Sequence, residues 1–104
     1  MAKVYHKLVR DKIPQIIQST GKTCTLRKLD REAYLQMLDR KLDEELEEFR
    51  QSGEAEELAD LMEVIAALGA AKGYSWEQLL QLRQEKRQRR GGFDEQLLLL
   101  EVSD

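Results

Sequence analysis

The 104-residue chain has few of the residue types on which many small proteins and enzymes depend. It contains one cysteine, Cys24, one histidine, His6, and one proline, Pro14. A lone cysteine excludes an internal disulfide and suits a reducing compartment. Because His6 is the only histidine that could activate the thiol, we interpret Cys24 as a small core residue rather than a nucleophile. The sequence has no set of residues that fits a Ser/His/Asp or Cys/His catalytic arrangement, and a second histidine for a ferritin-type di-iron site is missing.

Long hydrophobic runs are also missing. The first twelve residues contain no apolar run of signal-peptide length, and the LLLL run at 97–100 is far shorter than a membrane span. We therefore expect a cytoplasmic protein without a membrane partner. The net charge of −3 argues against general binding to nucleic acid, although charge is segregated: residues 39–63 carry a net charge of −8 and residues 83–90 one of +4.

The residues that are abundant favour helices. Hydrophobic residues make up 41% of the chain and charged residues 36%, with many Leu, Glu, Lys, Arg, Gln and Ala. Hydrophobic periodicity and cap signals predict long helices over 31–51 and 54–72, separated by a QSG break. Ser75 and Gln78 form a capping box for a third helix that ends near residue 89.

The remaining segments give weaker signals. Asp11 is a candidate N-cap for a short helix with Pro14 in its first turn. Residues 22–29 alternate like a short strand or an extended arm, and residues 93–104 fit either a short helix or an extended tail. No repeat or linker divides the chain, so we predict one domain over residues 1–104.

We predict an all-α fold, a four-helix-like bundle completed by homo-oligomerisation. A chain of this length buries only about two-thirds of its unfolded surface at best, and its helices carry broad apolar faces. A second copy is therefore expected to complete the core, which makes the protein at least a dimer.

Acidic residues occupy unexpected positions on the two long helices. The apolar stripe of the first helix consists of Leu35, Leu38, Leu42, Leu46 and Phe49. The stripe of the second consists of Leu58, Leu61, Met62, Ile65 and Leu68. Glu45 falls inside the first stripe and Glu57 inside the second, whereas Glu48 and Asp60 lie on the stripe edges.

The short break makes the two helices antiparallel neighbours. Glu45 should then lie opposite Asp60, and Glu48 opposite Glu57, because both pairs are centred on Ser52 and Gly53. Four converging carboxylates repel one another unless a cation neutralises them, and oxygen ligands suit Mg²⁺ or Mn²⁺. The alternative is that Lys41, Arg50 or Lys72 forms ion pairs with these carboxylates.

The order of these residues resembles a known family. Glu44-Glu45-x-x-Glu48 followed by Glu57-x-x-Asp60 is similar to the metal motif of the MazG-like all-α nucleoside triphosphate pyrophosphohydrolases. The opening YHKLVRDKIPQII and the closing KRQRRGGF resemble small phosphoribosyl-ATP pyrophosphohydrolase-like members. The resemblance therefore covers nearly the whole chain.

The resemblance implies Mg²⁺-dependent cleavage between the α- and β-phosphates of a nucleoside triphosphate, giving a monophosphate and pyrophosphate. It also implies that Glu45, Glu48, Glu57 and Asp60 are metal ligands and that Glu44 acts on the attacking water. Glu44 and Glu45 are accordingly our catalytic candidates. Family members associate into dimers or tetramers with sites at or near the subunit interface, and the expected role is the removal of non-canonical or excess nucleotides.

Basic residues are needed to hold the phosphates of such a substrate. The candidates for substrate binding are Lys7, Arg10, Lys12, Lys41, Lys86 and Arg90. Two other functions remain open: a phosphoribosyl-ATP pyrophosphohydrolase of histidine synthesis, and a non-catalytic helical module whose acidic face binds a basic partner.

Overall fold

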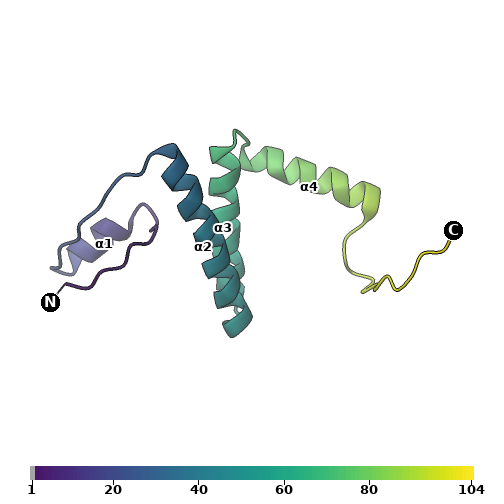
Figure 1. Ribbon diagram of the computed structural model, residues 1–104, viewed down its shortest axis with the longest axis horizontal. Coiled ribbons are helices and arrows are strands. Elements are labelled where there is room, and N and C mark those ends of the chain that lie inside the picture. Colours follow the sequence, from purple (N-terminus) through teal and green to yellow (C-terminus); the bar gives the residue numbers. More distant parts are fainter. Residues whose placement is uncertain (1) are drawn as a thin grey trace.

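The computed structural model describes residues 2–104 and contains four helices (Figure 1). They are α1 (Ile13–Ser19), α2 (Arg31–Ser52), α3 (Ala55–Ala71) and α4 (Trp76–Arg90). No strand occurs anywhere in this range, which confirms the all-α prediction. The three long helices end within one residue of the predicted bounds, and residues 22–29 form an extended arm rather than a strand. The residues after α4 form an extended tail.

Local signals fix the helix ends. The Asp30 side chain accepts a hydrogen bond of 2.8 Å from the Ala33 amide and so caps α2. Gly53 ends this helix in the left-handed conformation, with a φ of 67°. Ser75 and Gln78 form the predicted capping box of α4.

The predicted Asp11 cap of α1 is wrong. Lys12 occupies the N-cap position and makes no side-chain cap bond. The chain turns into the helix through a backbone bond of 3.1 Å from the Ile13 amide to the Arg10 carbonyl. Pro14 lies in the first turn as expected, where its missing N–H would have no helical partner in any case.

The core lies between α2 and α3, which pack side by side as a hairpin (Figure 1). Leu38 of α2 and Val64 of α3 are its only buried apolar side chains within residues 2–104, with exposures of 2% and 7%. The other apolar residues of the α2 stripe are half-buried. The hairpin core therefore contains few fully buried apolar side chains.

The single apolar stripe predicted for α3 is in fact two stripes. Val64, which the prediction left out, is buried, and Leu61 and Leu68 on the same side of the helix are half-buried. An outer stripe, Leu58, Met62 and Ile65, is instead 43–51% exposed. This helix carries apolar residues around more than half of its circumference, so periodicity alone did not identify the side that faces α2.

The four helices do not form a bundle within one chain. α4 meets α3 only near their connection, and no Cα pair within 8 Å joins α4 to α2, or α1 to any other helix, in residues 2–104 (Figure 1). The radius of gyration is 18.5 Å, whereas a compact domain of this length has one of about 13 Å. Among the described helices, none combines the length and apolar composition that crossing a bilayer requires.

Candidate metal centre

Glu45 is the most buried charged residue of residues 2–104, with an exposure of 6%. It lies in the half of α2 nearest the hairpin turn, seven residues after Leu38 on the same stripe. The helix therefore places a carboxylate where packing calls for a leucine. The sequence predicted this burial correctly.

The side chain of Glu45 is only partly satisfied. Its Oε1 lies 3.4 Å from Lys41 Nζ, and the same ammonium lies 3.4 Å from Glu44 Oε1. The Oε2 atom of Glu45 is buried and has no hydrogen-bond partner in residues 2–104. Burial raises the pKa of the Glu45 carboxyl, the nearby Glu48 raises it further, and Lys41 opposes both effects.

Glu45 joins two groups of carboxylates. The first group consists of Glu45, Glu57 and Asp60, and the second of Glu44, Glu45 and Glu48. In each group, one carboxylate oxygen from every residue lies within 4.8 Å of the others. The mirror arrangement of Glu45 and Asp60 about the turn is thus observed. Glu48 is exposed and belongs to the group on α2, not to the group that contains Glu57.

Glu57 repeats the feature of Glu45 on the facing helix. Glu57 as a whole is half-buried, yet its Oε2 atom is buried and has no hydrogen-bond partner within residues 2–104. Buried polar atoms nearly always have a partner, so two orphaned carboxylate oxygens on facing helices require an explanation. Oxygen ligands of this kind fit a hard divalent cation such as Mg²⁺ or Mn²⁺.

The N-terminal segment brings two predicted phosphate-binding residues to these carboxylates. Arg10 Nη2 donates to Asp60 Oδ1 at 2.6 Å, and Lys7 Nζ lies 3.9 Å from Glu44 Oε1. Both basic side chains remain about half exposed. Together with Lys41, they form a rim of positive charge beside the carboxylates.

Other basic candidates lie elsewhere. Lys12 is the exposed N-cap of α1 and forms no ion pair within residues 2–104. Lys86 and Arg90 are exposed on the last turns of α4, which leaves α3 at the end opposite the hairpin turn (Figure 1). A single chain therefore does not bring Lys86 and Arg90 to the carboxylates.

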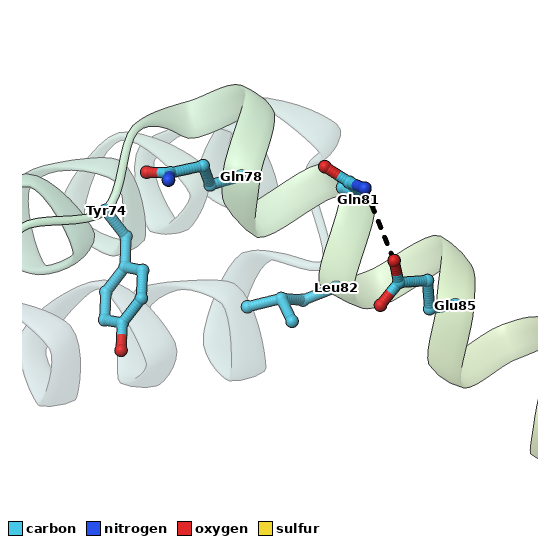
Figure 2. A pocket seen from close by; sticks show the side chains of 5 residues that line it. All are labelled: Tyr74, Gln78, Gln81, Leu82 and Glu85. Atoms are coloured by element: carbon cyan, nitrogen blue, oxygen red, sulfur yellow. Dashed lines mark hydrogen bonds between the residues drawn. The ribbon is translucent and has the colours of Figure 1, made fainter.

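A shallow groove of about 260 Å³ lies on α4 and not at the carboxylates (Figure 2). Its lining residues are Tyr74, Gln78, Gln81, Leu82 and Glu85. Gln81 Nε2 donates to Glu85 Oε1 at 3.4 Å along the groove. None of the residues that line this groove is basic, so it offers no side-chain cation for a phosphate, and the carboxylates are the stronger candidate site.

The Arg10–Asp60 pair was not expected from the sequence. The sequence predicts Arg10 as a phosphate ligand and Asp60 as a metal ligand, without any contact between them. Fifty residues separate the two, and the N-terminal segment has no periodicity from which its docking could be inferred.

Comparison with known proteins adds little. A protein of Mycolicibacterium smegmatis, described as uncharacterised, is 48% identical over 44 residues, which are 42% of this chain and 45% of that protein. The chain thus spans less than half the length of this relative. The sequence matches no protein-family model, and no solved structure matches the fold.

Proposed function

We propose that the α2–α3 hairpin binds a divalent cation, Mg²⁺ or Mn²⁺, through Glu45, Glu57 and Asp60, with Glu48 at the edge. The observation that carries this proposal is the pair of buried, unpartnered oxygens, Oε2 of Glu45 and Oε2 of Glu57. Leaving charged atoms buried without a partner is costly, and a bound cation would remove that cost.

Charge balance supports the same proposal. The carboxylates of the two groups are Glu44, Glu45, Glu48, Glu57 and Asp60. The cations paired with them are Lys7, Arg10 and Lys41. Within residues 2–104, five negative and three positive charges leave these groups with a net charge of −2, which favours the binding of a cation.

We further propose that the site hydrolyses a nucleoside triphosphate between its α- and β-phosphates, releasing a monophosphate and pyrophosphate. The residue pattern resembles the MazG-like pyrophosphohydrolases, and Lys7 and Arg10 lie where phosphate oxygens could reach them. When bound, the cation would neutralise phosphate charge and lower the pKa of a bound water. Phosphoribosyl-ATP is an alternative substrate for the same reaction.

Glu44 has a suitable position for a role in proton handling. Its Oε1 is held by Lys41 at 3.4 Å and by Lys7 at 3.9 Å, whereas no ion pair within residues 2–104 involves its Oε2. Both ammonium groups lie nearest Oε1, which would leave the other oxygen for an attacking water. Glu45 would act as a ligand through its buried oxygen.

We also propose that a second copy completes the fold. The accessible surface is 9782 Å², whereas a compact protein of this mass exposes about 6,000 Å². The difference exceeds the area that one partner buries in an ordinary interface, about 800 Å². The outer stripe of α3 and the apolar tail residues Leu97–Leu100, which are 79–86% exposed, would supply much of that surface.

The proposed reaction is tested with a panel of nucleoside triphosphates and phosphoribosyl-ATP, incubated with Mg²⁺, with identification of every product. We expect a monophosphate and pyrophosphate with Mg²⁺, and neither with a chelator. Glu45→Gln should abolish the activity. The matched control Glu47→Gln, on the exposed side of the same helix, should retain it. Release of orthophosphate alone, or no release from any substrate, would show that the proposed reaction is wrong.

A further inference from the structure

Arg10 forms an ion pair with Asp60, which is one of the proposed ligands of the cation. Its guanidinium donates to Asp60 Oδ1 at 2.6 Å, the shortest ion pair within residues 2–104. Asp60 also belongs to the group that it forms with Glu45 and Glu57, and each of these two residues has one buried oxygen without a hydrogen-bond partner within residues 2–104. A positive charge from the N-terminal segment therefore lies next to the position that a cation would take.

The Arg10–Asp60 ion pair is weak enough for a cation to replace Arg10 at Asp60. The two side chains are 55% and 37% exposed, and ion pairs with that much solvent contribute little net stability. Arg10 belongs to a segment without helix or strand, residues 2–12, and the two ion pairs of Lys7 and Arg10 join it to the hairpin. A cation with two charges would compete effectively for the Asp60 oxygen.

We infer that Arg10 exchanges partners: it binds Asp60 when the cation is absent and a phosphate group when the cation is present. This inference rests on the cation site proposed above. Cation binding at Asp60 releases the guanidinium, whose planar fork binds phosphate oxygens in a bidentate manner. The ligand class is a di- or triphosphate chain that reaches the carboxylates together with the cation.

The exchange couples the two ligands. The affinity of the site for the cation is lowered because the cation must displace Arg10 from Asp60. That affinity rises again when a phosphate group binds the released guanidinium. By linkage, the cation must raise phosphate affinity by the same factor. Removing Arg10 therefore has opposite effects on the two ligands, which distinguishes a competing residue from a merely structural one.

The experiment measures binding calorimetrically in the full chain, first of Mg²⁺ alone and then of inorganic pyrophosphate at saturating Mg²⁺. Arg10→Gln should bind Mg²⁺ about threefold more tightly than the parent, because its competitor is gone. The same variant should bind pyrophosphate about tenfold more weakly. Arg10→Lys should compete for Asp60 like the parent but recover only part of the pyrophosphate affinity, since an ammonium lacks the fork.

Arg27→Gln is the matched control, because Arg27 is exposed and forms no ion pair within residues 2–104. It should leave both affinities unchanged. If the parent binds Mg²⁺ but Arg10→Gln weakens or does not alter that binding, the exchange is wrong and the cation site stands. If the parent binds no Mg²⁺, the cation site and the exchange are both wrong.

Discussion

Replacing Glu45 with leucine tests two effects of the buried carboxylate separately: the folding stability that its burial costs, and the Mg²⁺ binding that we propose for it. Glu45 is 6% exposed, one of its oxygens has no hydrogen-bond partner within residues 2–104, and burial raises the pKa of its carboxyl. Desolvating a carboxylate costs several kcal/mol, and the ion pair of Glu45 with Lys41 recovers only part of that cost. Lys41 keeps Glu44 as a partner at 3.4 Å, so the variant leaves no ammonium unpaired.

Leucine at this position continues the apolar stripe and adds about 2 kcal/mol of side-chain burial. Allowing for imperfect fit, we expect metal-free Glu45→Leu to be at least as stable as the parent, by about 1 kcal/mol or more. For a chain of this length that gain raises Tm by about 4 °C. At a concentration of 100 times its Kd, Mg²⁺ should stabilise the parent by about 2.7 kcal/mol and the variant hardly at all.

The assay is thermal unfolding of both proteins at one protein concentration, with Mg²⁺ and with a chelator. Glu47→Leu is the control, because Glu47 is exposed on the same helix and its pair with Arg50 is long, at 3.8 Å. This control should gain no stability in the chelator and should keep the full response to Mg²⁺. If metal-free Glu45→Leu is clearly less stable than both other proteins, Glu45 is a structural partner of Lys41 and the reasoning fails.

Two further predictions concern pH and assembly. Since the folded state raises the pKa of Glu45 above its ordinary value of 4.5, its contribution to stability is present below that value and is lost as pH rises through the folded pKa. In chelator, Tm of Glu45→Gln should exceed that of the parent at pH 7 and converge with it near pH 4; a constant difference would contradict this. Met62→Glu should reduce the mass by light scattering to that of one chain, because Met62 lies on the exposed outer stripe, whereas Glu63→Gln should not.

Much of the local structure was predictable because it depends on neighbouring residues. The cap signals of Asp30 and Ser75 gave the starts of two helices, and the burial of Glu45 followed from a clear stripe on α2. The position of Asp60 opposite Glu45 followed from the short connection at Ser52–Gly53. These predictions needed only helical periodicity and one turn.

The rest depends on contacts between distant segments. The inner and outer stripes of α3 are both apolar, so nothing in the sequence distinguished Val64 from Met62. The direction of α4 is set after a short connection that allows many angles, and the observed angle keeps Arg90 away from the carboxylates. The contact of Arg10 with Asp60 joins residues that are fifty positions apart, and no periodic pattern in the sequence relates them.

The burial of Glu45 also determines how strongly the proposed site could bind a cation. The attraction between two charges grows as the surrounding dielectric falls, so a carboxylate that is as buried as Glu45 binds a cation more strongly than one in water. The same burial makes the charged form of Glu45 costly, and the few buried apolar side chains between α2 and α3 contribute little to offset that cost. The proposed cation and the proposed second copy would each stabilise a hairpin with this core and this charge, the first by neutralising the buried carboxylates and the second by covering exposed apolar surface.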